Sequence, residues 1–318
     1  MGNNAIGIER LGRSLCAQVH GADLSKPLSD ADFAAIHDGL AEHEMLLFRD
    51  QDITASSQLE FGRRFGPPSV HPFSPNLADM PELIVLDNHQ DNPPRLTDIW
   101  HSDETFRAEP PMATILRSTI TPKLGGDTMF ASMSAAYDDL SDHLQHFLSG
   151  LEAVHDFKPF RTLLANDEDG HRRLRELEAK FPLQHHPVVR LHPVSGRKVI
   201  FVNPQFTIGI KGMDEREAQP LLAMLFDLAK VPEYQYRLQW QPNTLAIWDN
   251  RSVLHYAIHD YQPQRRRMER ITICGDRPFG VQDGRQVPLI ARQPIAAETP
   301  SAFEAEPVRE VYRGGRNA

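Results

Sequence analysis

Short hydrophobic runs separated by polar, glycine-rich or proline-rich turns occupy most of the chain. Seven runs have the length and composition of strands, at residues 45–48, 83–86, 113–119, 127–131, 234–240, 245–248 and 269–274. Residues 186–202 predict a hairpin that turns at Ser195-Gly196. Many short strands with turn signals between them are typical of an antiparallel sandwich or barrel. The pattern therefore predicts a mainly β fold with a few flanking helices.

Three segments have helical spacing of their apolar residues. Residues 29–43 begin with the N-cap candidate Ser29 and an acidic first turn, residues 55–65 stop at Gly66-Pro67-Pro68, and residues 214–230 form the longest predicted helix. The charge-rich segment 160–181 has no readable period, and we expect it to form a lid. We expect residues 1–280 to form one catalytic domain with helical insertions. The remaining segment, 281–318, predicts a peripheral or partly disordered extension.

Composition narrows the possible partners. The 318 residues carry 34 Lys and Arg against 43 Asp and Glu, a formal net charge of −9. This charge argues against nucleic acid as a general partner, because a phosphate backbone is usually met by a basic face. The two cysteines, Cys16 and Cys274, exclude a disulfide framework and make a thiolate zinc site improbable. We expect a cytoplasmic protein, since no signal peptide or run of ~20 apolar residues is present.

The first candidate for chemistry is the run Trp100-His101-Ser102-Asp103. In an extended backbone, residues two apart point to the same side, so His101 and Asp103 can bind one metal ion. An isolated pair of this kind also occurs in many loops, where the histidine simply bonds the acid. Two histidines and one carboxylate on one face of the metal are the ligands of non-haem Fe(II) oxygenases. The hypothesis therefore requires a second, distant histidine.

His255 is the preferred second histidine. It follows the predicted strand 245–248 and the turn Asp249-Asn250, and it lies about one hairpin before Arg266. His259 is the rival by proximity, but its neighbours have the composition of a loop. The predicted metal ligands are His101, Asp103 and His255.

Several separated motifs resemble the taurine/2,4-D dioxygenase family in order and spacing, from about Ile8 to Phe279. They are Phe61-Gly62 with Phe65-Gly66, WHSDETF, Gly125-Gly126-Asp127-Thr128, and WDNRSVLHYAIHDY followed by RRRMERITICGDRPF. The resemblance implies a double-stranded β-helix (jelly-roll) core with the three metal ligands at one mouth. It also implies Fe(II) as cofactor and 2-oxoglutarate and dioxygen as cosubstrates. Substrate hydroxylation would then accompany the release of succinate and carbon dioxide.

The resemblance places the cosubstrate on Arg266 and Thr128. The distal carboxylate of 2-oxoglutarate is best met by a planar, two-pronged cation, which arginine supplies. The run Arg265-Arg266-Arg267 on its own would be a solvated loop. Motif position selects Arg266 alone, and we expect Arg265 and Arg267 to be surface charges.

Within the family, the sequence is most similar to taurine and alkylsulfonate dioxygenases. That resemblance implies a substrate site made of Arg270 and His71 as anion contacts and Phe160 and Phe206 as aromatic walls. Hydroxylation beside a sulfonate would release an aldehyde and sulfite. Each residue also has a structural alternative: Arg270 pairs with an acid such as Glu269 or Asp276, His71 caps a loop, and the phenylalanines belong to the core.

Two positions depart from the taurine enzymes. Glu104 replaces a small apolar residue, and Thr97 replaces an asparagine. An extra carboxylate beside an anion site suggests a small anionic substrate that also carries an ammonium group or another hydrogen-bond donor. Aryloxyalkanoates, alkylsulfates, phosphonates and amino-acid-like biosynthetic substrates are the alternatives.

Two other functional classes were weighed. A zinc hydrolase could use the same three ligands but would not need Thr128 and Arg266. A non-catalytic binding protein on the same fold would be indicated by loss of a metal ligand, and all three are present. The resemblance also suggests a homo-oligomer, either a dimer or a tetramer.

Overall fold

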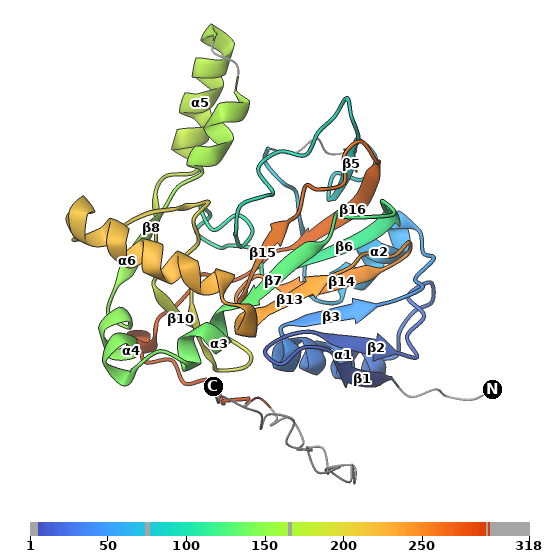
Figure 1. Cartoon of the computed structure of the whole chain (residues 1–318), viewed down its shortest axis with the longest axis horizontal. Coiled ribbons are helices and arrows are strands. Elements are labelled where there is room, and N and C mark those ends of the chain that lie inside the picture. Colours follow the sequence, from blue (N-terminus) through green and yellow to red (C-terminus); the bar gives the residue numbers. More distant parts are fainter. Residues whose placement is uncertain (1–5, 74–76, 165–166, 291, 293–318) are drawn as a thin grey trace, which may run out of the picture.

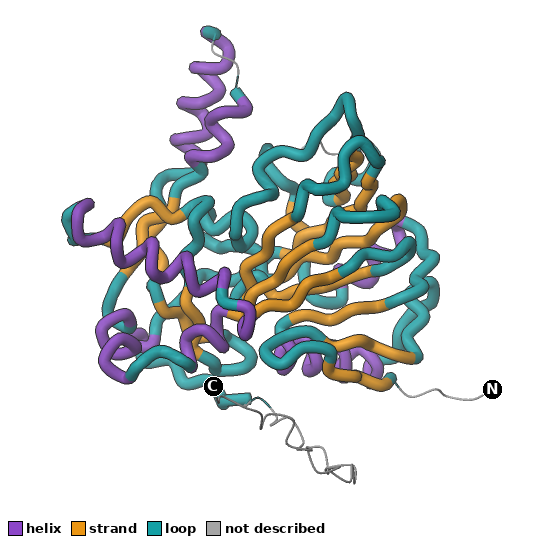
Figure 2. The backbone as a smooth tube through the Cα atoms, in the orientation of Figure 1, coloured by secondary structure: helices purple, strands orange, loops and turns teal. Residues whose placement is uncertain are grey.

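The computed structural model describes residues 6–73, 77–164, 167–290 and 292. The predicted C-terminal extension therefore lies mostly outside the described residues. The predicted class, mainly β-sheet with flanking helices, is confirmed (Figure 2). In the described part of the chain, no helix is long and apolar enough to cross a membrane.

One large sheet dominates the fold (Figure 1). Neighbouring strands are antiparallel except for the parallel pair β2 and β3. Their order is β1 (Gly7–Arg10), β2 (Ala17–His20), β3 (Met45–Phe48), β14 (Leu245–Asp249), β6 (Ala113–Ile120), β16 (Arg266–Ile273) and β4 (Pro68–Ser69), with β5 (Leu83–Asn88) also paired to β16.

A smaller sheet, β13 (Gln235–Leu238), β7 (Thr128–Ser132) and β15 (Val253–Ala257), packs against the large one. Phe130, Leu238 and Val253 from the small sheet share one hydrophobic cluster with Ala246 and Trp248 from the large sheet. The described strands do not close into a continuous barrel, because the small sheet has no ladder to the large one. The space between the two sheets is where the candidate site lies.

Side-chain alternation decides which residues enter that space. On β14, Ala246 and Trp248 face the small sheet, whereas Leu245 and Ile247 face the opposite side. That opposite side is covered by α1 (Asp30–His43) and α2 (Ala55–Arg63). Both helices were predicted, and the Ser29 hydroxyl caps α1 by accepting a hydrogen bond from the Asp32 N–H.

The remaining elements surround a second hydrophobic core. They are α3 (Met133–Asp138), α4 (Asp142–Leu148), β8 (Glu152–His155), β9 (Gln184–Pro187), β10 (Val189–Leu191), β11 (Lys198–Ile200), β12 (Thr207–Ile210) and α6 (Glu215–Asp227). The predicted hairpin is confirmed for β10 and β11, which turn at Ser195-Gly196. It is wrong for residues 186–187, which lie in β9 and pair with β8. The predicted helix 214–230 is α6, followed by a short 3-10 turn, Leu228–Lys230.

Helix α5 (Glu168–Lys180) projects from the body at the top of Figure 1. It occupies the segment for which the sequence showed no period. Most of its side chains are exposed, and only Leu174 and Leu177 reach a buried aromatic cluster. Leu174 and Leu177 are the only large apolar residues of the helix, so the charged residues dominated the sequence pattern.

The central strand supplies a test of the packing. Ile247 lies opposite Leu46 and Ile115 on the neighbouring strands and is fully buried. We expect Ile247→Ala to lower the free energy of unfolding by ~2–5 kcal/mol, because burial is lost and a cavity is left. Urea unfolding measures the change. Leu124→Ala is the control, since Leu124 is 79% exposed; an equal loss in both variants would contradict the assigned core.

Candidate metal centre and active site

His101, Asp103 and His255 come together as the sequence predicted. One ligand atom from each lies within 4.8 Å of the other two, and all three residues are buried. His255 lies on β15, and His101 pairs with it through an isolated antiparallel bridge. The N–H of His101 donates to the His255 carbonyl at 3.0 Å, and the N–H of His255 donates back at 2.8 Å. The two rings therefore stand on the same side, with centroids 4.1 Å apart.

Hydrogen bonds fix the orientation of the ligand groups. His101 Nδ1 lies 2.7 Å from the Ile99 carbonyl, so Nδ1 carries the proton and Nε2 keeps its lone pair. Asp103 Oδ2 accepts a hydrogen bond from the Thr114 hydroxyl, which in turn accepts one from Asn250 Nδ2 at 2.9 Å. Asp103 Oδ1 is left facing the two imidazoles, 3.8 Å from His101 Nε2 and 3.9 Å from His255 Nε2.

The electrostatics suit metal binding. Burial lowers the pKa of both histidines, Arg270 adds to this effect on both, and the His101 ring further lowers the pKa of His255. Burial opposes ionisation of Asp103, but Arg270 and the two histidines together hold the pKa of its carboxyl below the usual range. Two neutral imidazoles and one carboxylate on a common face match the donor set of a non-haem Fe(II) site.

Arg266 and Thr128 line the same cavity, which has a volume of about 90 Å³. Arg266 Nε donates to the Gly126 carbonyl at 3.1 Å, and Nη2 lies 3.5 Å from the Thr128 hydroxyl. Burial lowers the pKa of Arg266 to about 10, which leaves the guanidinium charged at neutral pH. The cavity thus has one fixed cation with a hydroxyl beside it.

Arg265 and Arg267, the neighbours of Arg266, do not face the cavity, because successive side chains of a strand point to opposite sides of the sheet. Arg265 is exposed and paired with Asp87, as expected for a surface charge. Arg267 is only half-buried and bonds Glu269 at 2.8 Å on the helix-covered face. Residues 266 and 270, at even spacing, both face the cavity.

Gly126 permits the approach of Arg266. Its φ of +73° favours glycine, and a Cβ there would lie 2.9 Å from Pro122 Cγ and 3.2 Å from Arg266 Cδ. The second glycine of the Gly125-Gly126 pair is therefore required on steric grounds.

Arg270 lies beside the metal ligands. Its Nη2 forms an ion pair with Asp103 Oδ1 at 3.0 Å, while its Nε has no hydrogen-bond partner among the described residues. The alternative partners are engaged elsewhere, Glu269 with Arg117 and Asp276 with Arg190. Arg270 thus presents a buried N–H donor at the cavity, as an anion contact requires.

Four of the other predicted substrate residues, His71, Glu104, Phe160 and Phe206, form one group. His71 and Glu104 are buried, with His71 Nε2 3.8 Å from Glu104 Oε1. The ring of Phe160, from the 3-10 helix Lys158–Leu163, lies 5.8 Å from His71 and 5.7 Å from Phe206. His71 also caps its loop, because Nδ1 accepts from the Phe73 N–H at 3.2 Å.

Thr97 lines the cavity but bonds His259, whose Nε2 is 2.8 Å from the Thr97 hydroxyl. His259 Nδ1 lies 3.6 Å from Asp98. The rival histidine is therefore part of the cavity wall and is not in the three-residue cluster.

Sequence reasoning missed the residues that support the ligands. Thr114 and Asn250 orient Asp103, as described above. Thr105, two residues after Asp103, is bonded by His155 Nδ1 at 2.9 Å, by Asn203 at 3.0 Å and, through its carbonyl, by His186 at 3.0 Å. The only sequence signal was the presence of polar residues inside predicted buried runs.

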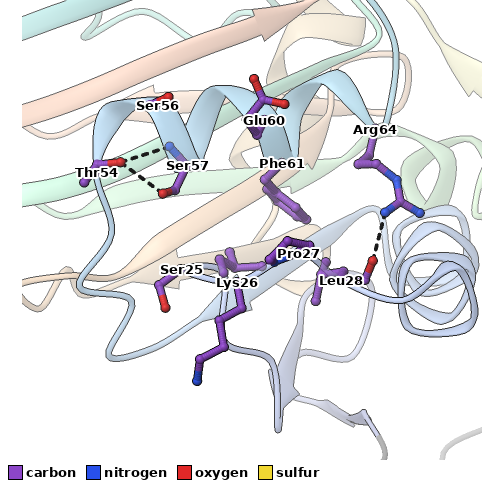
Figure 3. A pocket seen from close by; sticks show the side chains of 11 residues that line it. Ser25, Lys26, Pro27, Leu28, Thr54, Ser56, Ser57, Glu60, Phe61 and Arg64 are labelled. Atoms are coloured by element: carbon purple, nitrogen blue, oxygen red, sulfur yellow. Dashed lines mark hydrogen bonds between the residues drawn. The ribbon is translucent and has the colours of Figure 1, made fainter.

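A larger cavity of about 360 Å³ lies elsewhere, between the 24–28 loop and α2 (Figure 3). Its polar groups already bond protein partners: Thr54 with Ser57, and Arg64 with the Leu28 carbonyl and Asp30. None of the predicted site residues lines it. The size of a cavity therefore does not identify the candidate site, because the predicted site residues line the smaller cavity.

Comparison with known proteins decides the family. The sequence profile described as "Taurine catabolism dioxygenase TauD, TfdA family" matches residues 7–272. The chain belongs to this family. The prediction of a 2-oxoglutarate-dependent dioxygenase is thereby confirmed.

Three relatives of this TauD/TfdA-family chain have different names. A sulfate ester dioxygenase of Pseudomonas putida is 35% identical over 85% of this chain and 89% of its own length. A 2,4-dichlorophenoxyacetate dioxygenase of Cupriavidus pinatubonensis is 31% identical over 82% of this chain and 94% of its own length. The crystal structure of a taurine dioxygenase from Burkholderia xenovorans is 33% identical, covers 89% of this chain and 95% of its own, and superimposes with a TM-score of 0.75.

The support of Asp103 in this family member can be tested. We expect Thr114→Val to weaken Fe(II) binding ~10–100-fold, because the carboxylate loses the donor that orients it. Anaerobic Fe(II) titration gives the dissociation constant. Thr272→Val is a matched control, since Thr272 lies opposite Thr114 in the sheet and its hydroxyl has no partner in the described structure. Equal losses would assign the effect to packing.

A pH effect follows from His186. Burial lowers its pKa to about 4, against ~6.5 in an unfolded chain. Between these values only the unfolded state binds the proton. The free energy of unfolding therefore falls as pH drops through this window, by up to ~1.4 kcal/mol per pH unit.

We expect His186→Gln to reduce this slope, because Gln keeps a donor near the Nε2 position without titrating. Urea unfolding between pH 7 and about pH 5 measures it. The exposed His143→Gln is the control and keeps the wild-type slope. A wild-type slope in His186→Gln would show that another group titrates.

Proposed function

We propose that the chain hydroxylates a small anionic substrate in an Fe(II)- and 2-oxoglutarate-dependent reaction, with a sulfonate or sulfate ester as the first candidate. One observation carries the proposal. Arg266 and Arg270 line one cavity from the same side of β16, His101 and His255 lie in its wall, and Asp103 completes the metal cluster with these two histidines. Two separate cations suit two separate anions, a cosubstrate and a substrate.

His101, Asp103 and His255 would hold the iron. When bound, iron would supply the activation of dioxygen, coupled to conversion of 2-oxoglutarate into succinate and carbon dioxide. The chain's own contribution is orientation. The Ile99 carbonyl fixes the His101 ring, and Thr114 with Asn250 fixes the Asp103 carboxylate. Because the donor set has only three protein ligands, a metal ion held there would keep open positions for 2-oxoglutarate and dioxygen.

Arg266 and Thr128 would bind the distal carboxylate of 2-oxoglutarate. The Thr128 hydroxyl accepts a hydrogen bond from Trp240 Nε1 at 2.9 Å, so its own proton is free to point elsewhere. The guanidinium lies 5.8 Å from the Trp240 ring centroid and is almost fully buried. Water is largely excluded there, which strengthens a charge-assisted bond to a carboxylate.

Arg270 would bind the anionic group of the primary substrate, with His71 as the second contact. Burial, helped by Arg270, lowers the pKa of His71 to about 3, so His71 acts as a neutral hydrogen-bonding group. Hydroxylation of the carbon next to a sulfonate would release an aldehyde and sulfite. The names of the sulfate ester and taurine relatives support this substrate class.

An aryloxyalkanoate is the second candidate. Phe73, Phe106, Phe160 and Phe206 form a continuous aromatic cluster that begins at His71. Such a wall suits an aromatic ring behind a carboxylate, and one relative is named for a phenoxyacetate.

The fold supports the same assignment. We propose that the two packed sheets are the halves of a double-stranded β-helix and that residues 6–280 form one catalytic domain. The cluster between the sheets joins residues from Leu15 to Met268. Assembly into a homo-oligomer stays a prediction.

The deciding measurement is the visible charge-transfer band that Fe(II) and 2-oxoglutarate give together, recorded without oxygen. We expect the wild type to form the band and Arg266→Gln to need ~10–100-fold more 2-oxoglutarate, the usual loss for a hydrogen bond to a charged group. Arg265→Gln should match the wild type, because Arg265 is exposed and points away. Absence of the band in folded, iron-loaded wild type would reject both the metal and cosubstrate sites.

A further inference from the structure

Glu104 has an unusual backbone conformation directly after the predicted metal ligand Asp103. Its φ is +47°, in the left-handed region that costs free energy for a residue with a side chain. Glycine or asparagine would adopt this conformation more readily. A strained glutamate next to a reactive centre indicates that its side chain is needed where the backbone places it.

Only one of the two carboxylate oxygens of Glu104 is hydrogen-bonded. Oε2 accepts a hydrogen bond from Arg107 Nε at 2.6 Å, and Arg107 is itself held by the Val70 carbonyl at 3.2 Å. Oε1 is buried and has no hydrogen-bond partner in the part of the chain described. It faces His71, whose Nε2 is 3.8 Å away, beyond hydrogen-bonding range.

Arg270 also has an unsatisfied donor. Its Nε is buried and has no hydrogen-bond partner among the described residues, whereas its Nη2 forms an ion pair with Asp103 Oδ1 at 3.0 Å. Asp103 directly precedes Glu104, so the two unsatisfied groups lie in the same part of the site. Buried polar atoms are nearly always hydrogen-bonded in folded proteins. One ligand with an anionic group and a donor group would satisfy both residues.

We infer that Glu104 Oε1 accepts a hydrogen bond from the primary substrate, and so selects an anionic sulfonate whose tail carries an ammonium or hydroxyl donor over one with a plain alkyl tail. This inference rests on the proposed function and on Arg270 as the anion contact. Arg107 is a positioning residue, since it bonds Glu104 Oε2 and leaves Oε1 unbonded. A bare alkyl tail would leave Oε1 buried and unsatisfied.

Three sulfonates of similar length test this selection on the wild type: 2-aminoethanesulfonate, 2-hydroxyethanesulfonate and propane-1-sulfonate. We expect at least one donor-bearing compound to exceed propanesulfonate ~10–100-fold in kcat/KM, measured as succinate and sulfite formed. A preference for the amine assigns the donor as an ammonium, and a preference for the alcohol assigns it as a hydroxyl. Equal or better turnover of propanesulfonate overturns the inference.

Glu104→Gln then tests the residue itself. The amide keeps the size of the side chain and can still bond Arg107, but it removes the negative charge. We expect the preference over propanesulfonate to fall ~10-fold or more, mainly through KM. Glu109→Gln, which removes an exposed carboxylate five positions along the same segment, should keep the wild-type preference.

Binding provides a readout independent of turnover. Each sulfonate is titrated, without oxygen, into protein carrying Fe(II) and 2-oxoglutarate, and the shift of the visible band gives its dissociation constant. Unchanged relative affinities in Glu104→Gln, with a normal band, overturn the inference while the proposed function stands. Loss of the band in the wild type removes the proposed function as well.

Discussion

The reciprocal backbone hydrogen bonds between His101 and His255 are the constraint on which the site depends. Neither residue can move along its strand without breaking two bonds at once, and a shift by one position would turn one ring to the opposite side. The bridge joins the His-Ser-Asp segment to β15, and β15 pairs with β7, which carries Thr128. Metal ligands and cosubstrate contact are thus held in a single hydrogen-bonded frame.

Strand alternation extends that frame to the large sheet. Thr114 on β6 and Arg266 and Arg270 on β16 all point toward the small sheet, whereas Arg117 and Glu269 point to the helix-covered face and neutralise each other. The pairing of β6 with β16 therefore places Arg270 at the cavity and the neighbouring Glu269 in an ion pair with Arg117 on the other face. Glu269 pairs with Arg117 on the other face, so it does not engage Arg266 or Arg270 on the cavity side.

These relations explain what the sequence could and could not predict. His101 with Asp103 follows from two-residue spacing in an extended segment, so the local pattern was enough to suggest that pair. Arg266 and Arg270 were selected by their positions in the family motifs, because local pattern alone would have placed the basic run in a solvated loop. Thr114, Asn250 and His155 reach the site only through pairings between distant strands, which no local pattern encodes. Helix α5 was missed because it buries few apolar side chains. Residues 186–187 were assigned to the wrong strand because they belong to β9, which pairs with the preceding strand β8 and not within the hairpin. Glu104 was suspected from its identity, but its bond to Arg107 depends on a left-handed turn.

The division between strands and loops also bears on specificity. The residues expected to bind iron, 2-oxoglutarate and the substrate anion lie on β15, β16, β7 and the segment paired with β15, where register fixes them. His71, Glu104 and Phe160 lie outside regular strands, where a changed side chain does not disturb a ladder. Relatives about one-third identical to this chain are named for a sulfate ester, a phenoxyacetate and taurine, all of which carry an anion with a different tail. In the proposed function, the anion contact Arg270 lies on a strand and the tail contact Glu104 lies on a loop, so the tail contact is the part of the site that can change without disturbing strand pairing.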